Sequence, residues 1–562
     1  MIQARNFLRF FFGFSFLIVG TSIFCQNTFQ IAQQKINSGN IDEGISILDS
    51  LLKSDTENAQ LWATLGLAYR QKKSFEKSVM NYQKALSLNP DSDRLMFQTG
   101  LAHAMAKDLD SSFEILNKLK VKGSFNMTNV GNFAQLFNED VRYQNLFPSK
   151  EEFADPFSED VEIIHEWVGE VTNDQFGWIA RNIGDVDKDG FNDMITSSIG
   201  SNEGGQGVGK IYVYSGKSGK LLWSQVGEDV NGNLGLSIEM AGDVNADGVP
   251  DVVATAPQVN KVFVYNGRNG KQIWKWEGVD STGAFGRSAK GLGDINGDGH
   301  SDILIGEPYQ IWGAPINGNL ISHAGKFHIY SGKSGKVLKT WEGEKIGDGF
   351  GTACGGATIG KQTFMIFGAP NAGRNNGGKV YVYKDLSDKP AFVIEADSTG
   401  RQLGGMFLSV VGDVDADGTP DIYASDWANA ALGRSTGRVY VHSGATGEQL
   451  YSWTGEAAGD GFGIGVSDAG DVNLDGHDDL IIASWQYRGK APSGGKCYVY
   501  SGKDGSIIRT ITGKVPGETL GFDTTNLGDI NEDGIPDFLV TSAWSAINGF
   551  QSGRVYVISG KE

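Results

Sequence analysis

Cysteine and histidine are scarce in this chain of 562 residues, which contains three cysteines and seven histidines. Three cysteines cannot form the disulfide framework of a small secreted domain, so we expect packing and bound ions to stabilise the fold. Zinc is disfavoured as well, because it prefers sulfur and imidazole ligands. The sequence contains no nucleophile elbow, phosphate loop or zinc-protease helix. We therefore expect a protein that is not an enzyme.

Proline and basic residues are also few. The chain has 13 prolines against 79 glycines, and 48 Lys and Arg against 67 Asp and Glu, which gives a net charge of −19. Such a charge argues against nucleic acid or an anionic membrane surface as a partner. Abundant glycine with 40% hydrophobic residues indicates a turn-rich β protein rather than a disordered one. The length indicates at least two domains.

Residues 1–25 are typical of an export signal. Arg5 and Arg9 precede the run "FFFGFSFLIVGTSIF", which is short for a membrane span and is followed by polar chain. Cleavage near this point and lipid attachment at Cys25 are both open, and the bulky Phe24 favours simple cleavage. We expect an exported protein, periplasmic, cell-surface or secreted, without a transmembrane span in the mature chain.

Residues 27–125 show a helical repeat of 34 residues. In "AQLWATLGLAYRQKKSFEKSVMNYQKALSLNP" the large and small residues recur at i, i+3, i+4 and i+7, namely Trp62, Leu65, Gly66, Tyr69, Ser78, Tyr82, Ala85 and Pro90. This spacing resembles the tetratricopeptide repeat, with weaker copies on both sides. The resemblance implies a groove for a peptide or protein, and a spacer or dimer contact is the alternative. Residues 126–160 are expected to form a helical linker.

A second repeat covers residues 161–562. Six acidic loops begin at Asp185, Asp243, Asp294, Asp413, Asp471 and Asp529, with intervals of 58, 51, 119, 58 and 58 residues. Because 119 is two periods, we expect a seventh unit without the loop between Phe350 and Pro370. Each unit contains four short strand patterns, and seven four-stranded units are the signature of a β-propeller.

The ends of this repeat predict how the ring closes. The last unit stops after its third strand, whereas residues 162–177 match a fourth strand that precedes the first unit. Pairing of the two would leave no free sheet edge. Phe-Gly at one end of a unit and Gly368-Ala369-Pro370 at the other resemble the FG-GAP repeats of integrin α subunits. The fold class is thus mainly β: a seven-bladed propeller closed by an N-terminal strand and preceded by a short all-α array.

The acidic loops have the ligand chemistry of calcium. Asp at positions one, five and nine, with Asp or Asn at three, supplies hard oxygen ligands, and Gly at six allows position seven to offer its backbone carbonyl. An EF-hand is excluded, because Glu at position twelve and flanking helices are missing. We expect up to six structural calcium ions, with none in the fourth blade, where the pattern is lost at Ala357–Lys361. The predicted ligands are Asp185, Asp187, Asp189, Phe191, Asp193, Asp243, Asn245, Asp247, Val249, Asp251, Asp294, Asn296, Asp298, His300, Asp302, Asp413, Asp415, Asp417, Thr419, Asp421, Asp471, Asn473, Asp475, His477, Asp479, Asp529, Asn531, Asp533, Ile535 and Asp537.

Three tryptophans mark a candidate ligand face. Trp427, Trp485 and Trp544 follow the second strands of consecutive units, at the end opposite the acidic loops. They could stack on sugar rings or anchor a protein partner. Packing between blades is the favoured alternative.

These observations predict an exported, calcium-binding adhesion or recognition protein. Its propeller face would bind a protein or glycan, and the tetratricopeptide array would be a second interaction site. The alternatives are a structural subunit of a cell-envelope assembly or, with less support, a propeller lyase or quinone-dependent dehydrogenase.

Overall fold

The chain divides into two compact units, residues 1–125 with 129–147, and residues 126–128 with 148–562. The structure is a computed structural model that describes residues 28–122, 134–137, 140–280, 283–309, 323–465 and 468–561. The export signal expected at residues 1–25, with Cys25, lies outside the described residues.

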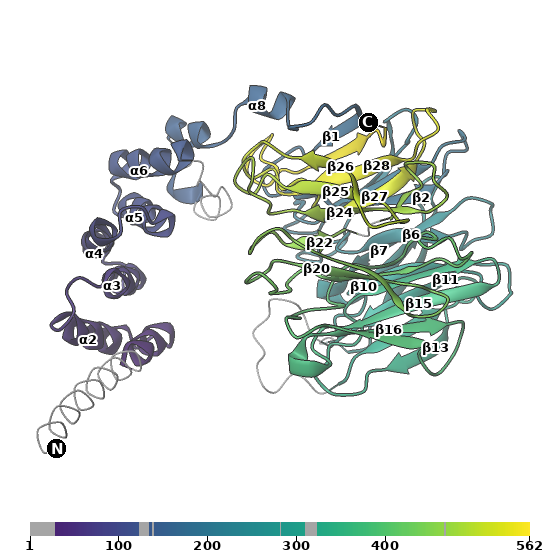
Figure 1. Cartoon of the computed structure of the whole chain (residues 1–562), viewed down its shortest axis with the longest axis horizontal. Helices are drawn as coiled ribbons and strands as arrows, with labels where there is room; N and C mark the ends of the chain where they lie inside the picture. Colours follow the sequence, from purple (N-terminus) through teal and green to yellow (C-terminus); the bar gives the residue numbers. More distant parts are fainter. Residues whose placement is uncertain are drawn as a thin grey trace, which may run out of the picture. The chain divides into compact units, whose positions relative to one another are not determined.

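The first unit is a series of helices (Figure 1). Residues 28–37 are helical and are followed by α2 (Ile41–Leu52), α3 (Ala59–Gln71), α4 (Phe75–Leu88), α5 (Asp93–Met105) and α6 (Leu109–Val121). Helices α3 and α4 pack closely because Gly66 has no side chain: a Cβ there would lie 2.7 Å from the ring of Tyr82. The Ser78 hydroxyl donates to the Gly66 carbonyl at 2.8 Å. The expected helical repeat is confirmed.

Short helical segments follow this array. They are η1 (Ala134–Leu136), η2 (Val141–Leu146) and α8 (Lys150–Ala154). Phe157 forms a bridge with Gly513 and is buried in the core of the second unit. The second unit therefore begins before residue 161.

The second unit contains seven sheets of antiparallel strands, one for each predicted blade. The strands, in blade order, are β2 (Phe176–Gly184), β3 (Asp193–Ser198), β4 (Lys210–Tyr214) and β5 (Leu221–Val226); β6 (Ile238–Gly242), β7 (Asp251–Ala256), β8 (Lys261–Tyr265) and β9 (Gln272–Glu277), with η3 (Pro257–Val259) between β7 and β8; β10 (Ser288–Gly293), β11 (Asp302–Glu307), β12 (Lys326–Tyr330) and β13 (Val337–Glu342); β14 (Cys354–Ile359), β15 (Gln362–Ala369), β16 (Lys379–Lys384) and β17 (Phe392–Glu395), with η4 (Arg374–Asn376) between β15 and β16; β18 (Leu408–Val410), β19 (Ile422–Asp426), β20 (Arg438–His442) and β21 (Gln449–Thr454); β22 (Phe462–Ile464), β23 (Asp468–Gly470), β24 (Asp479–Ser484), β25 (Lys496–Tyr500) and β26 (Ile507–Thr512); and β27 (Thr524–Gly528), β28 (Asp537–Ser542), β29 (Arg554–Ile558) and β1 (Ile163–Val168).

The seventh blade confirms the predicted closure. Its order is β1-β29-β28-β27, so a strand from the start of the second unit completes a sheet made from its end. Trp167 of β1 pairs with Val555 of β29. The closure leaves no unpaired edge on β29.

Hydrophobic cores lie between neighbouring blades. One core joins residues of blades one and two, another joins blades two and three, and a larger one joins blades five, six and seven. The second strands β3, β7, β11, β24 and β28 are buried along their whole length.

Aromatic residues on several fourth strands link one blade to the next. The indole nitrogens of Trp223 and Trp274 each donate to a glycine carbonyl, of Gly267 and Gly332, at 2.6 Å. Trp276 donates to Gly335 in the same way. These hydrogen bonds add a directional link to the packing between blades.

Candidate metal sites in the acidic loops

The six acidic loops lie between the first and second strands of their blades. Gly at position six has a φ between 76° and 93° in every loop, in the left-handed region where glycine is favoured. Position four is also left-handed, although it is Lys188, Ala246, Ala416, Leu474 or Glu532 in five loops. No sequence signal marks position four, because only Gly297 has the residue type that this backbone favours.

The aspartate at position nine is fully buried in each loop. In the first blade, Asp193 Oδ2 accepts from the Val186 and Asp187 amides at 2.8 and 3.2 Å, and Oδ1 accepts from the Gly216 amide at 3.0 Å. The same contacts recur around Asp421, with Val414, Asp415 and Gly444. Position nine therefore closes the loop onto the turn after the third strand. That turn was not among the predicted site residues, although its repeated Ser-Gly motif could have indicated it.

Burial perturbs these carboxyl groups. Desolvation raises the pKa of Asp251 and Asp421 to about 7. It raises the pKa of position nine in the other loops, Asp193, Asp302, Asp479 and Asp537, to about 6. Backbone amides offset only part of this cost, so each loop favours an additional positive charge.

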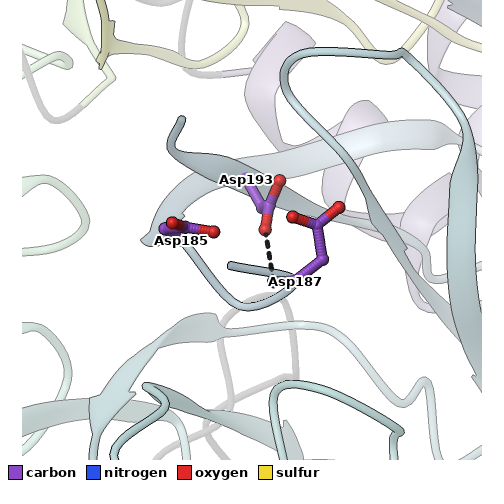
Figure 2. A group of neighbouring side chains, drawn as sticks. All are labelled: Asp185, Asp187 and Asp193. Carbon is purple, nitrogen blue, oxygen red and sulfur yellow. Dashed lines mark hydrogen bonds between the residues drawn. The ribbon is translucent and has the colours of Figure 1, made fainter. Parts of the chain in front are cut away.

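The remaining carboxylates converge on the same point. Figure 2 shows the side chains of Asp185, Asp187 and Asp193 gathered around the first loop, with the bond from the Asp187 amide to Asp193 drawn as a dashed line. One oxygen from each of these residues lies within 4.8 Å of the others, and Asp413, Asp415 and Asp421 form the same arrangement. Desolvation, followed by repulsion from position five, raises the pKa of Asp187 and Asp415.

The other four loops have Asn at position three. In the second blade, Asn245 Oδ1 is buried and has no hydrogen-bond partner among the described residues. Asn266 Oδ1, on the turn after the third strand, is also buried without a hydrogen-bond partner among the described residues. The side-chain nitrogen of Asn266, Nδ2, donates to Asp247 Oδ2 at 2.7 Å. Two buried oxygens without donors, beside a buried carboxylate, fit a hard cation.

The two histidines at position seven each contact the acidic loop of the preceding blade. His300 Nδ1 lies 2.7 Å from the Val244 carbonyl, and His477 Nδ1 lies 2.9 Å from the Val414 carbonyl. Their imidazoles thus connect neighbouring loops. The predicted use of their backbone carbonyls as metal ligands stays a prediction.

The fourth blade has a tight hairpin where the others have an acidic loop. Ile359 pairs with Gln362 across the turn at Gly360-Lys361, and the Thr358 and Thr363 hydroxyls lie 2.7 Å apart. Where the loops of the other blades have their predicted ligands, this hairpin has neutral residues and one lysine.

The three tryptophans of the candidate ligand face are not equally accessible. Trp485 is 8% exposed and packs edge-to-face against Trp544 at 4.6 Å, with Phe522 beside both. Trp427 and Trp544 are partly exposed. The burial of Trp485 does not fit a stacking platform that uses all three rings.

Comparisons with known proteins support both repeats. The FG-GAP-like repeat family matches residues 243–305, and the tetratricopeptide repeat family matches residues 59–92. Integrin alpha-2 of Bos taurus is 30% identical over 178 residues, 28% of this chain and 15% of the integrin. Integrin alpha pat-2 of Caenorhabditis briggsae is 31% identical over 233 residues, 36% of this chain and 19% of the integrin.

One relative overturns an expectation. The human phosphatidylinositol-glycan-specific phospholipase D is 25% identical over 407 residues, 60% of this chain and 47% of the relative. The expectation that the chain is not an enzyme, which was drawn from missing motifs, is therefore wrong, because a protein named for an enzymatic activity is similar to 60% of this chain. The chain spans about half the length of that relative and a fifth or less of the integrins.

No helix in the described part of the chain combines the length and the apolar composition that a bilayer span requires. The repeat matches, the seven sheets and the helical array agree with one another. The chain combines tetratricopeptide repeats with an FG-GAP-type β-propeller related to that of integrin α subunits.

Proposed function

We propose that this protein is an exported, calcium-stabilised recognition protein whose propeller binds a protein or glycan. The observation that carries the proposal is the similarity to integrin α subunits, together with the FG-GAP-like match over residues 243–305, which include two acidic loops. The N-terminal apolar run of residues 1–25 supports export.

Calcium is the ion that best suits the loops. Positions one, three, five and nine supply only carboxylate and amide oxygens, which calcium prefers and which leave no thiolate or ligating imidazole for zinc. Each carboxylate oxygen has two lone pairs, so the backbone hydrogen bonds leave acceptor capacity for a metal. We assign up to six ions a structural role: they would neutralise repulsion within each loop and hold the first and second strands together.

The tetratricopeptide array supplies a second candidate interaction site. A groove of about 940 Å³ is lined by side chains of both charges and by amides, including Asn58, Arg70, Arg94 and Gln98. The Arg70 guanidinium donates to Gln98 at 2.6 Å. The charged and amide side chains that line the groove suit the backbone and side chains of an extended peptide.

A binding screen tests the proposal. The full chain is immobilised and exposed to a glycan panel and to purified envelope proteins, in calcium and in chelator. Capture of one ligand that needs calcium supports recognition by the propeller, and loss of that capture in Trp427→Ala would place the ligand on the candidate face. Capture that is unchanged in chelator and lost in Arg70→Ala would favour a scaffold that uses the groove. The absence of any calcium-dependent ligand contradicts the proposal.

A second candidate function is hydrolysis of a phosphatidylinositol-glycan. The similarity to the phospholipase D over 407 residues favours it. The test is release of a glycosylphosphatidylinositol-linked reporter from vesicles by the purified chain. Release above that of a heat-inactivated sample supports this candidate, and equal release contradicts it.

A further inference from the structure

A polar network is buried where the first strands of the blades meet. The Arg181 Nε donates to Glu239 Oε1 at 2.7 Å, and its Nη1 donates to Asp523. Lys290 Nζ lies 2.6 Å from the second oxygen of Glu239. These residues come from blades one, two, seven and three, so the network connects strands far apart in the sequence. Within it, two positive and two negative charges balance.

A cavity of about 90 Å³ lies beside this network. Its walls come from the starts of the first strands, which are the ends opposite the acidic loops. Aromatic and apolar side chains form much of the wall, namely Trp178, Leu236, Met406, Phe407 and Phe522. The charged residues that line it are Arg181, Glu239 and Arg287.

Arg287 differs from the other charged residues of the cavity. Arg181 and Glu239 are paired, whereas no described residue accepts a hydrogen bond from the Arg287 guanidinium or forms an ion pair with it. Burial lowers the pKa of Arg287. The Arg287 side chain is only partly exposed, so desolvation of its guanidinium costs free energy that a paired anion would offset. The cavity therefore has one positive charge in excess.

The chemistry of the cavity selects among anions. A guanidinium binds a carboxylate through two parallel hydrogen bonds. A doubly charged phosphate would need further donors, but the Ser288 and Thr352 hydroxyls of the wall donate to the Gly351 and Gly349 carbonyls. Among the wall hydroxyls, this leaves that of Ser237. The volume corresponds to about three water molecules, which suits a carboxylate with a short hydrocarbon chain. We propose that this cavity is a binding site for a small apolar carboxylate, with Arg287 as its anchor.

The bound carboxylate could belong to a free acid or to a glutamate side chain of a protein partner. Cys354 also lines the cavity, and burial raises the pKa of its thiol to about 12. That thiol stays protonated and would not compete as an anion. The site is separate from the acidic loops, so this proposal does not rest on calcium-dependent recognition.

Calorimetric titration of the full chain with propionate, at fixed calcium and ionic strength, tests the site. Propionamide is the uncharged control, and inorganic phosphate is the control for general anion binding. N-acetylglutamate amide presents the same group as a protein side chain would. We expect saturable binding of propionate that is at least tenfold weaker in Arg287→Met and partly retained in Arg287→Lys. Arg268→Met, which changes an exposed arginine, should bind as the unmodified chain does.

Binding of propionate alone would identify a free acid, and stronger binding of N-acetylglutamate amide would identify a protein side chain. The melting temperature without ligand is a second measurement. Because Arg287→Met removes an unpaired charge that is only partly exposed, it should melt at or above the temperature of the unmodified chain. Equal binding of propionate and propionamide, equal binding of phosphate, unchanged binding in Arg287→Met, or a lower melting temperature of that variant would each overturn the proposal.

Discussion

The indole nitrogen of Trp167 donates to the Gly219 carbonyl at 2.9 Å, across 52 residues of sequence. Trp167 belongs to β1, which completes blade seven, and Gly219 lies in the last turn of blade one. Trp276 and Gly335 make the same contact between blades two and three. The closing strand therefore links its blade to the next one in the same way as an ordinary fourth strand does.

Removal of the closing strand should destabilise the propeller. A chain that begins at Gly169 lacks β1 and exposes the edge of β29, whereas a chain that begins at Pro148 keeps the strand. We expect the shorter chain to melt at least about 10 °C lower or to aggregate, because an unpaired edge recruits other chains. Scanning calorimetry and light scattering measure both effects. Equal melting of the two chains would mean that β1 does not close the ring.

Calcium removal should lower the melting temperature of the second unit. Ions that bind only the folded state stabilise it by about 2.7 kcal/mol per site at a concentration of 100 Kd. With several sites, we expect a shift of about 5 °C or more in chelator, restored by calcium. Magnesium at the same concentration is the control, because it prefers a smaller octahedral site. An unchanged melt in chelator would contradict the assignment of the loops.

The substitution Asp415→Asn should lower calcium affinity without lowering the stability of the calcium-free fold. Four of the six loops have Asn at this position, so the backbone should accept it. Desolvation and repulsion from Asp417 raise the pKa of Asp415, and removal of its charge should leave stability in chelator unchanged or higher. Calcium affinity should fall about tenfold, because the site loses one carboxylate. Asn245→Asp is the reverse change and should increase affinity in the second blade.

The aspartate at position nine should stabilise the fold even without metal. Asp421 is fully buried and accepts three backbone amides, so Asp421→Ala leaves those donors without partners. We expect a loss of about 3 kcal/mol in the free energy of unfolding, measured with urea in chelator. The control Asp417→Ala removes an exposed carboxylate that accepts from the Thr419 amide and should cost less than about 1 kcal/mol. Similar losses for both variants would show that position nine has no separate role in closing the loop.

The central ion pairs should behave as a unit. Arg181→Met leaves Asp523 buried beside no cation, which should cost about 3–5 kcal/mol. Asp523→Asn in the same chain removes that charge and should recover part of the loss. Urea unfolding of both variants provides the measurement. If Arg181→Met lowered the free energy of unfolding by less than about 1 kcal/mol, solvent would have to reach the Asp523 carboxylate.

The sequence alone determined the repeats, the number of blades and the strand that closes the ring. These features follow from local patterns: the strand alternation, the tight turns and the acidic loops recur within each unit of about 58 residues. Within one loop, the ligand positions lie at most eight residues apart, so their convergence follows from the turn that Gly190 and its equivalents permit.

The tertiary structure alone decided which residues meet at the centre of the propeller. Arg181 and Asp523 are 342 residues apart, and their contact depends on how closely seven blades pack around one axis. Arg287 has no ion pair among the described residues for the same reason, since the Glu239 carboxylate of its cavity is paired with Arg181 and Lys290. The buried state of Trp485 and the left-handed turn at Lys188 likewise depend on packing and loop closure. No short pattern in the chain records any of these features, because each arises from groups that the folded ring brings together.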